Sequence, residues 1–553
     1  MKKELWTLPL LILIIFLAVY MHRKEGPTTQ EWQQLNQSVE GRLVQVGSPK
    51  PSELEELQNP FVIEEYPWGT SSTGWLKGWS AVAGPYAVAA ENTNDIVAAV
   101  KFARKHGLKV AIKGTGHDYL GRSTAPHSLL IWTHPMRNVT VHDAFIPAGA
   151  PPEKAGVPAV TAEAGARWVE VYSEVTSKHG RYVQGGGCAT VGAAGGFIQG
   201  GGFGSFSKKY GLGAASLLEA EVVLASGEVV IANEYQNADL LWALKGGGGG
   251  TFGVVSKVTL QTHDLPEFFG DLRGKISAKS DEAFQALLER FITFYRENLS
   301  NEHWGEQVTV KSDNSLELAL LFQGLTQKEA EDLWKPFFDW VNSQPELYAL
   351  TSLFVIVPAQ KFWDFDYLQK NLTHYITPYK GDLFYWTGNQ NEVLAYWYAM
   401  QSRWIPLTLF TKDLAQSFFQ ASRQWEFVIH FNKGLAGGSP EALERSQNTS
   451  INPAALDAAG LLIFSALTQN VFPGMPGHEP DAKQGEEQIK KVQAAFKYIE
   501  KAIPDTSTYS NEADYFQKNW QADFWGKNYP RLLQIKKKYD PDGFFKCHHC
   551  VGS

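Results

Sequence analysis

Glycine is crowded into one stretch of the chain, from Gly185 to Thr259, with a cluster at each end. The first cluster reads GGGCATVGAAGGFIQGGGFG and contains Cys188, one of three cysteines in the whole chain. Glycine loses more backbone freedom on folding than other residues, so this crowding is expected where the backbone turns with positive φ or closely approaches another group. Successive N–H groups without Cβ atoms form hollows that bind anions. The stretch therefore predicts one wall of a site for a large anionic ligand.

The length and charge of the chain limit the classes of protein that fit it. A chain of 553 residues exceeds what one hydrophobic core usually organises, so we expect two large lobes. Aromatic residues make up 13% of the chain, a content that suits an enzyme with a large apolar cleft. The net charge of −8 provides no overall basic surface, so we expect no nucleic-acid partner.

The N-terminus carries a targeting signal. An apolar run from Leu5 to Met21 is about long enough to span a bilayer, and no small-x-small cleavage site follows it. We expect residues 1–24 to be an uncleaved signal anchor, with a cleaved signal peptide as the alternative. The protein would then enter the secretory pathway and be either attached to the membrane through one N-terminal helix or secreted.

The periodicity of the remaining chain predicts an α+β fold with two lobes. Polar residues 25–79 read as a linker or N-terminal extension. From Pro85, the strand YAVAA, a helix closed by Gly107 and the strand LKVAIKG form an α/β unit, and Ser226-Gly227 separates two strands of a hairpin. These belong to a lobe spanning 80–264. Residues 265–505 alternate amphipathic helices with strands, as in a lobe built on an antiparallel sheet covered by helices, and residues 506–553 form a C-terminal segment.

Several common nucleotide-binding and hydrolase motifs are missing. The chain has no G-x-x-x-x-G-K-[ST] P-loop, no G-x-G-x-x-G opening a helix after the first strand, no H-E-x-x-H and no G-x-S-x-G. These absences argue against the commonest NTPases, Rossmann dehydrogenases, metalloproteases and α/β hydrolases.

Four motifs together resemble a known family. Gly114-Thr115-Gly116-His117 follows a strand and continues to Gly121 and Ser123, and Gly186-Gly187-Cys188-Ala189-Thr190-Val191-Gly192 follows another strand. GGGGGTFGVV spans Gly246 to Val255. The tail contains Tyr509, Asn511, Trp520, Phe524-Trp525-Gly526, Asn528-Tyr529, Arg531-Leu532 and Tyr539-Asp540-Pro541. This set resembles the vanillyl-alcohol-oxidase superfamily with a PCMH-type FAD-binding domain, in the berberine-bridge-enzyme-like branch that includes isoamyl-alcohol-oxidase-like proteins.

The resemblance implies a PCMH-type FAD-binding domain at residues 80–264, a substrate domain at 265–505, and a C-terminal segment that returns to the FAD domain. It also implies bicovalent FAD, with His117 bonded to the 8α methyl group and Cys188 to C6 of the flavin. Imidazole and thiolate are nucleophiles of the kind that such bonds require. The other cofactor-binding residues that we expect are Lys113, Gly114, Thr115, Gly116, Gly121, Ser123, Gly187, Val191, Gly192, Gly196, Gly204, Tyr210, Gly253, Val254 and Asn528.

The remaining two cysteines lie in the C-terminal CHHC sequence. Cys547 and Cys550 can pair with each other, which would leave Cys188 free for the flavin. Two unreactive thiols are the alternative. Four adjacent residues cannot wrap one tetrahedral zinc ion, so we expect no metal site.

The resemblance further implies oxidation of a CH–OH or CH–NH substrate, with hydride transfer to FAD and molecular oxygen as acceptor. The family's catalytic glutamate corresponds to Gln469, which cannot act as a base. Tyr119 and Tyr509 match active-site tyrosines of the family, and we expect Tyr509 to be the base. Its phenol would need a lowered pKa, for which His430 or Lys433 could supply a cation.

A second interpretation also stays open. The family's plant members have a tyrosine where this chain has Phe203, and Gln469 replaces their glutamate. The chain could therefore be a flavin-binding dehydrogenase or a degenerate flavoprotein that the membrane anchor displays.

Overall fold

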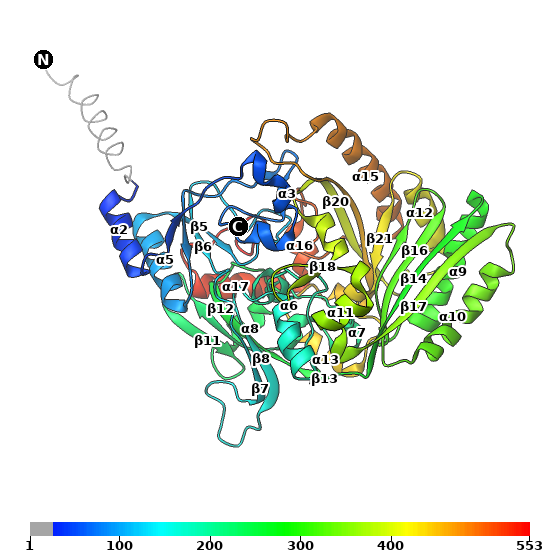
Figure 1. The fold of residues 1–553 in the computed structure, drawn as a ribbon, viewed down its shortest axis with the longest axis horizontal. Coiled ribbons are helices and arrows are strands. Elements are labelled where there is room, and N and C mark those ends of the chain that lie inside the picture. The colour runs from blue at the N-terminus through cyan, green and yellow to red at the C-terminus, as the bar shows by residue number, and fades with distance from the viewer. Residues whose placement is uncertain (1–25) are drawn as a thin grey trace, which may run out of the picture.

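The computed structural model describes residues 26–553 and shows two lobes side by side (Figure 1). The expected signal anchor at residues 1–24 lies outside the described residues. Within 26–553, none of the helices combines the length and the apolar character needed to cross a bilayer.

The first lobe begins with a four-stranded sheet that contains the α/β unit expected from the sequence. Its order is β1 (Leu43–Gln45), β4 (Tyr86–Ala89), β6 (Ser128–Trp132) and β5 (Lys109–Lys113), and β6 lies parallel to both β4 and β5. Helix α5 (Thr93–His106) connects β4 to β5. The side chain of Asn92 caps its first turn, and Gly107 ends it in a left-handed conformation at φ +64°.

A five-stranded antiparallel sheet completes this lobe. Its order is β11 (Val229–Asn233), β10 (Leu217–Val223), β12 (Val254–Gln261), β8 (Val157–Glu163) and β7 (Val139–Phe145). The turn between β10 and β11 lies at Ser226-Gly227, with Gly227 at φ +79°, so the expected hairpin is confirmed. The C-terminal helix α17 (Tyr529–Tyr539) packs against α8 (Ala238–Leu244) of the same lobe, which shows that the tail returns to it.

The second lobe is built on a nine-stranded sheet, which confirms the expected α+β fold with a large antiparallel sheet. Every neighbouring pair is antiparallel except β2 and β20, which run parallel. The strand order is β17 (Tyr348–Pro358), β14 (Phe268–Ala278), β16 (Ser315–Gln323), β15 (Trp304–Val310), β21 (Phe427–His430), β22 (Ala458–Thr468), β20 (Ala395–Pro406), β2 (Ser72–Trp75) and β3 (Trp79–Ser80).

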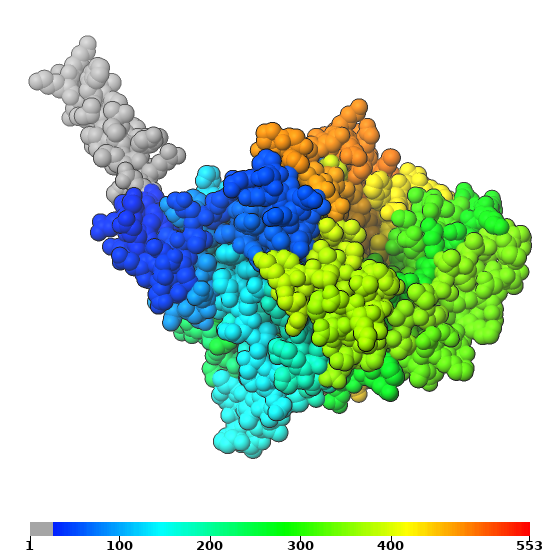
Figure 2. Space-filling model, in the orientation of Figure 1, coloured from blue at the N-terminus to red at the C-terminus, as the bar shows by residue number. Residues whose placement is uncertain are grey.

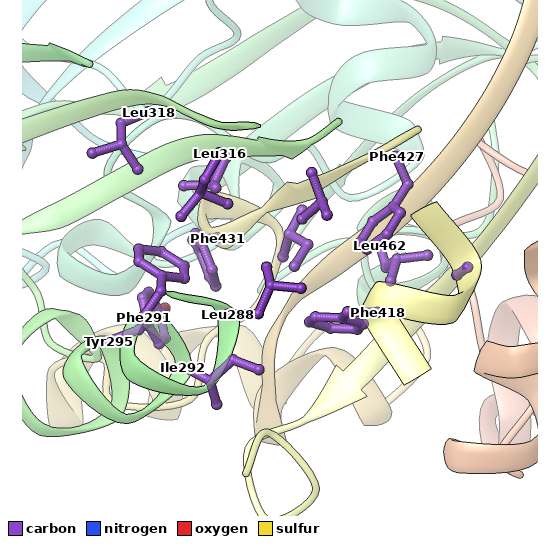
Figure 3. Packing of buried hydrophobic residues seen from close by; sticks show 14 of the residues in the cluster. Leu288, Phe291, Ile292, Tyr295, Leu316, Leu318, Phe418, Phe427, Phe431 and Leu462 are labelled. Carbon is purple, nitrogen blue, oxygen red and sulfur yellow. The ribbon is translucent and has the colours of Figure 1, made fainter. Parts of the chain in front are cut away.

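Four long helices cover one face of this sheet. They are α9 (Asp281–Phe294), α10 (Gln327–Asn342), α12 (Asp413–Ser422) and α15 (Ala482–Ala502). Alternate residues of β16, among them Leu316 and Leu318, point into the apolar layer under these helices, which also contains Phe291 of α9 and Phe418 of α12 (Figure 3). Since side chains alternate between faces, the residues between them in β16 face the opposite way, toward the first lobe.

The segment expected to be a linker or N-terminal extension, residues 25–79, is folded from residue 26 onward and joins both lobes. Strand β1 extends the first sheet, whereas β2 and β3 extend the nine-stranded sheet. Helices α2 (Thr29–Ser38), α3 (Leu54–Leu57) and α4 (Pro60–Glu64) lie between these strands. The sequence gives little sign of this because each of these strands has only two to four residues.

The remaining elements connect these layers. They are the helices α6 (Trp168–Tyr172), α7 (Ser207–Tyr210), α11 (Phe365–Asn371), α13 (Pro440–Gln447), α14 (Ala454–Asp457) and α16 (Trp520–Trp525), and the short strands β9 (Arg181–Tyr182), β13 (His263–Asp264), β18 (Ile376–Pro378) and β19 (Phe384–Trp386).

A buried lysine fixes the connection between the two lobes. Lys113, the last residue of β5, is buried, and its Nζ donates hydrogen bonds to the carbonyl oxygens of Tyr66, Pro67 and Gly69 at 3.0, 2.6 and 2.6 Å. Burial lowers the pKa of Lys113 to about 7, but three carbonyl acceptors match the three donors of a protonated ammonium group. Lys113 therefore anchors the backbone that leads from α4 to β2.

Replacing this lysine should weaken folding. In Lys113→Met, three carbonyl groups lose their donor, and we expect the free energy of unfolding to fall by about 3 kcal/mol. Urea denaturation followed by tryptophan fluorescence measures this loss. The matched control is Lys154→Met, which removes a partly exposed ion pair with Glu234 and should change stability by less than about 0.5 kcal/mol. Equal stability of the two variants would contradict the anchoring role.

Candidate functional site

A cavity of about 790 Å³ is lined by both lobes. One wall comes from the first lobe: the loop after β5 and the glycine-rich stretch that begins at Gly185. The opposite wall is the face of the nine-stranded sheet that the helices leave uncovered, including Ala319 and Leu321 of β16. The C-terminal segment adds Tyr509. The site therefore exists only where the two lobes meet.

The glycines near this wall fall into two groups. A Cβ atom built on Gly187, Gly195 or Gly196 would meet no other atom within 4 Å, so these residues present bare backbone to open space. By contrast, a Cβ on Gly185 would lie 2.3 Å from the ring of Trp168 and a Cβ on Gly253 2.5 Å from Val222. The first group leaves room for a ligand against the backbone, whereas the second group permits tight packing behind it.

Thr190 brings the histidine and the cysteine together. Its Oγ1 lies 2.9 Å from Nε2 of His117 and 3.9 Å from Sγ of Cys188. The other ring nitrogen, Nδ1, lies 3.3 Å from Oγ of Ser71. Two side chains that are 71 residues apart in the sequence thus share one hydroxyl partner at the cavity.

Burial sets the protonation state of both groups. It lowers the pKa of His117 to about 4, so the imidazole is neutral at pH 7 and keeps a nitrogen lone pair. Burial, assisted by the carboxylate of Glu392, raises the pKa of Cys188 to about 12, so this side chain is a thiol in the structure without a ligand. The histidine is therefore ready to act as a nucleophile, while the cysteine must first lose a proton.

Most of the expected cofactor-binding residues line the cavity. They are Gly114, Thr115, Gly116, His117, Ser123, Gly187, Cys188, Val191, Gly192, Gly196 and Gly253. The hydroxyl of Ser123 and the Oε1 atom of Gln199, which also lines the cavity, are buried without a hydrogen-bond partner. Such atoms are expected where a polar ligand completes the hydrogen bonding.

The other expected cofactor-binding residues do not line the cavity. Lys113 binds backbone carbonyls, Tyr210 stacks on Tyr182 with ring centroids 4.1 Å apart, and the amide of Asn528 donates to the carbonyl oxygen of Ile451 at 2.8 Å. Gly121, Gly204 and Val254 also lie outside the lining. Their motif positions shape the packing behind the wall, where a Cβ on Gly204 would lie 2.4 Å from a neighbouring carbonyl oxygen.

Both candidate tyrosines reach the cavity, but Gln469 does not. The hydroxyl of Tyr509 accepts a hydrogen bond from the amide of Asn511 at 3.0 Å, and that amide also donates to the carbonyl oxygen of Gly196 at 2.9 Å. Gln469 is exposed, and its amide donates to the carbonyl oxygens of Gln390 and Asn391. Gln469 directly follows the end of β22 and lies outside the cavity lining, so its place among the catalytic residues stays a prediction.

The cations expected to lower the pKa of Tyr509 do not do so. Burial places the pKa of His430 well below its usual value, so its imidazole is neutral. Nζ of Lys433 lies 2.5 and 2.6 Å from the two carboxylate oxygens of Glu512, which offset its charge. Burial and the nearby Glu512 raise the pKa of Tyr509 above its usual value. That Tyr509 is the base stays a prediction.

Two carboxylates that sequence reasoning missed also line the cavity. Glu392 accepts a hydrogen bond from Tyr119 at 2.9 Å, and Glu306 accepts one from Ser205. Glu306 has φ +69°, an uncommon conformation for a residue within a strand. Neither residue belongs to a recognisable motif, since each reaches the site through the folding of the second lobe.

Comparisons with known proteins identify the family. Residues 85–233 match the family model described as FAD binding domain, and residues 508–552 match the one described as berberine and berberine like. A FAD-linked oxidoreductase of Arthroderma benhamiae is 32% identical over 85% of this chain and 77% of its own. The VAO-type flavoprotein oxidase VAO615 of Thermothelomyces thermophilus is also 32% identical, over 85% of this chain and 76% of its own.

Solved structures agree with this result. The VAO-type flavoprotein MtVAO615 from Myceliophthora thermophila C1 matches with a TM-score of 0.78 at 27% identity, over 95% of each chain. Glucooligosaccharide oxidase from Acremonium strictum, described with a 6-S-cysteinyl, 8α-N1-histidyl FAD, matches in fold with a TM-score of 0.69 at 21% identity, over 94% of this chain and 98% of its own. The chain belongs to the FAD-linked oxidoreductases of the VAO and berberine-bridge-like family.

The residues around the cavity fit FAD. Bare backbone at Gly187, Gly195 and Gly196 leaves space for a flat ring system, and the unpartnered Ser123 and Gln199 offer hydrogen-bonding groups. His117 and Cys188 provide two nucleophilic atoms at the same wall.

Filling this open space should remove the cofactor without unfolding the protein. In Gly196→Val, the new side chain enters the cavity, and we expect the flavin content of the purified protein to fall at least tenfold, with only the decrease in unfolding midpoint that loss of the bound cofactor itself causes. Absorbance at the flavin band relative to protein measures this content. In Gly253→Val, the side chain meets Val222 instead, so loss of stability should accompany loss of flavin. Full flavin content in Gly196→Val would contradict the location of the site.

Proposed function

We propose that this protein is an FAD-linked oxidase that oxidises a CH–OH or CH–NH substrate, with molecular oxygen as the electron acceptor and FAD bonded to both His117 and Cys188. The observation that carries this proposal is the shared contact of both side chains with Thr190 at the glycine-rich wall. The relative VAO615, named as an oxidase, supports oxygen as the acceptor. The 6-S-cysteinyl, 8α-N1-histidyl FAD of glucooligosaccharide oxidase supports the double attachment.

The hydrogen bonds of His117 agree with attachment through Nδ1. Thr190 holds Nε2 at 2.9 Å, whereas the contact of Nδ1 with Ser71 is longer, at 3.3 Å. In a neutral imidazole one nitrogen donates and the other accepts, so a firm partner at Nε2 fixes the ring orientation. Nδ1 is then the nitrogen left for the flavin.

The residues of the cavity supply binding and proton transfer. A bound FAD would supply the acceptor for a substrate hydride and the route for two electrons to oxygen. The glycine-rich wall holds the cofactor, and the uncovered face of the nine-stranded sheet closes the opposite side and limits the entry of water. Tyr119 and Tyr509 are the two phenols placed at the cavity to receive a substrate proton.

A dehydrogenase or a flavoprotein without catalytic activity is the second candidate. The exposed position of Gln469 and the presence of Phe203, whose ring meets the edge of Tyr509 at a centroid distance of 5.1 Å, favour it. Anaerobic mixing with a panel of alcohols, sugars and amines, followed by air, separates the two. An oxidase loses its flavin colour and regains it in air with release of hydrogen peroxide, whereas a dehydrogenase stays bleached.

We also propose that the protein resides in the secretory pathway, through the apolar N-terminal run. The disulfide between Cys547 and Cys550 supports this proposal because such bonds persist in oxidising compartments. It also leaves Cys188 as the free cysteine, as expected from the sequence. Two sulfur atoms bonded to each other cannot ligate zinc.

Removing either attachment residue should leave the flavin bonded through the other one. In wild-type protein the flavin should stay with the polypeptide in denaturing electrophoresis, and it should do so in His117→Ala and in Cys188→Ala. In the double variant it should be released. Flavin fluorescence in the gel and the masses of the flavin-bearing peptides measure the outcome. Release from the wild-type protein in denaturant would overturn the covalent part of the proposal.

A further inference from the structure

One short helix connects three parts of the chain that the sequence motifs treat separately. The 3₁₀ helix η8 (Thr387–Glu392) follows β19 and precedes β20. It lies in the segment after α11 and β18, which covers the boundary between the lobes on the face that Figures 1 and 2 show. Four of its residues, Thr387, Gly388, Asn389 and Glu392, line the cavity.

The first contact of η8 reaches the cysteine loop. Oδ1 of Asn389 accepts a hydrogen bond at 3.3 Å from the backbone N–H of Ala189, the residue after Cys188. The second contact reaches the histidine loop, where the hydroxyl of Tyr119 donates to Oε2 of Glu392 at 2.9 Å. The helix thus contacts both loops that carry the proposed flavin attachments.

The third contact involves Gln469 at the end of β22. Its Nε2 donates to the carbonyl oxygen of Asn391 at 2.7 Å and to that of Gln390 at 3.3 Å. These are the two residues immediately before Glu392. Gln469 therefore holds, by hydrogen bonds, the backbone that leads to Glu392, although the Gln469 side chain lies outside the cavity lining.

The backbone after Glu392 is strained in a way that fixes its direction. Leu394 has φ +55° and its side chain is fully buried. A left-handed conformation at a bulky residue is unfavourable and persists only where the surrounding structure imposes it. This turn leads the chain from η8 into β20, two residues after Glu392.

The two tyrosines of the cavity differ in where their protons go. Tyr119 donates its proton to a carboxylate. Tyr509 accepts a hydrogen bond from the amide of Asn511, and among residues 26–553 its hydroxyl donates to no partner. A phenol that passes on its own proton can take one from a substrate, whereas a phenol without an acceptor can only hold the substrate in place.

We propose that Tyr119 and Glu392 form the proton-accepting pair of the active site, with Tyr119 facing the substrate, and that Gln469 is a positioning residue that holds Glu392. This inference rests on the proposed oxidase function. The family's glutamate corresponds to Gln469 in the sequence, whereas the carboxylate of this pair comes from Glu392 at the end of η8, which belongs to no sequence motif.

A hydroxyl substrate gives up one proton and one hydride in this step. The substrate O–H bond breaks, its proton passes to the Tyr119 oxygen, and the proton of Tyr119 passes to Glu392. The adjacent C–H bond breaks and its hydride goes to FAD, so the product is a carbonyl compound. Molecular oxygen takes the two electrons and two protons, one of them released by Glu392, and becomes hydrogen peroxide.

The groups that face this pair define its dependence on pH. Glu512 and Lys433 act on Glu392 from the C-terminal segment and from the turn after β21, and Cys188 faces Tyr119 from the glycine-rich wall. Burial raises the pKa of Glu392 above its usual value, and burial together with Glu392 raises that of Tyr119. Only the ionised carboxylate accepts a proton, so activity should fall as the pH drops through this raised pKa.

The main test compares kcat/KM across pH for holoenzyme variants, with the compound of the alcohol, sugar and amine panel that bleaches the flavin fastest. Glu392→Gln should lower kcat by about 10² to 10³ and abolish the fall at acid pH. Glu392→Asp should restore part of the rate together with the acid limb. Tyr119→Phe should match Glu392→Gln, whereas Tyr509→Phe should mainly raise KM.

A second measurement needs no substrate. The flavin absorption band of the wild-type holoenzyme should shift as Glu392 titrates, and this shift should disappear in Glu392→Gln. The matched control is Glu289→Gln, which changes an exposed carboxylate on the outer helix α9 and should alter neither the titration nor the rate.

The positioning role of Gln469 is tested by the kinetics and pH profile of a separate variant. Gln469→Ala should lower kcat about three- to tenfold with KM and flavin content unchanged, and it should shift the acid limb of the pH profile. A purely structural role would change stability but leave that limb in place.

The outcomes separate this inference from the proposed function. If flavin is bound and bleached by substrate, but Glu392→Gln keeps the wild-type rate and pH profile, the pair is not the proton acceptor. If Tyr509→Phe loses the rate and the acid limb instead, Tyr509 has that role. If no compound of the panel bleaches the flavin, the proposed function itself is overturned, and the inference falls with it.

Discussion

Backbone contact between the lobes is the constraint on which the active site depends. A Cβ atom at Gly305 of β15 would lie 1.7 Å from the carbonyl oxygen of Ser205. The two backbones therefore touch where the nine-stranded sheet meets the glycine-rich wall. The neighbouring residues, Ser205 and Glu306, are hydrogen-bonded through their side chains. This approach brings the uncovered face of the sheet over the wall and encloses the cavity.

The connection is strengthened because the N-terminal segment belongs to both lobes. Strand β1 pairs in the first lobe and β2 in the second, and Lys113 anchors the backbone between them. The ammonium group of Lys113 and the ion pair of the buried Arg167 with Glu64 of α4 tie the same segment to the first lobe. The relative position of the lobes, and hence the width of the cavity, is therefore set by buried polar contacts as well as by apolar packing.

The polar groups of the cavity have complementary roles because their environments differ. His117 is neutral and held by Thr190, which suits a nucleophile. Lys433 and Glu512 form an ion pair, and Glu512 still raises the pKa of Tyr509. Tyr119 has an acceptor for its proton while Tyr509 does not. The distinction between these two phenols comes from η8, whose position depends on contacts with three separate parts of the chain.

The sequence by itself determined the family, the α+β fold and the glycine-rich wall that we propose holds the cofactor. Those features are local: glycines, a histidine and a cysteine at fixed spacing after strands are visible in a short window of residues, and so are the 3.6-residue and two-residue periodicities of the helices and strands. It also indicated that Cys547 and Cys550 pair with each other. Only the tertiary structure decided which motif residues face the cavity. It places Lys113, Tyr210 and Asn528 outside the cavity lining, where they contact other parts of the protein. Only the tertiary structure revealed the contact between Glu392 and Tyr119. The two residues are 273 positions apart in the sequence, so no local pattern predicts that they are hydrogen-bonded.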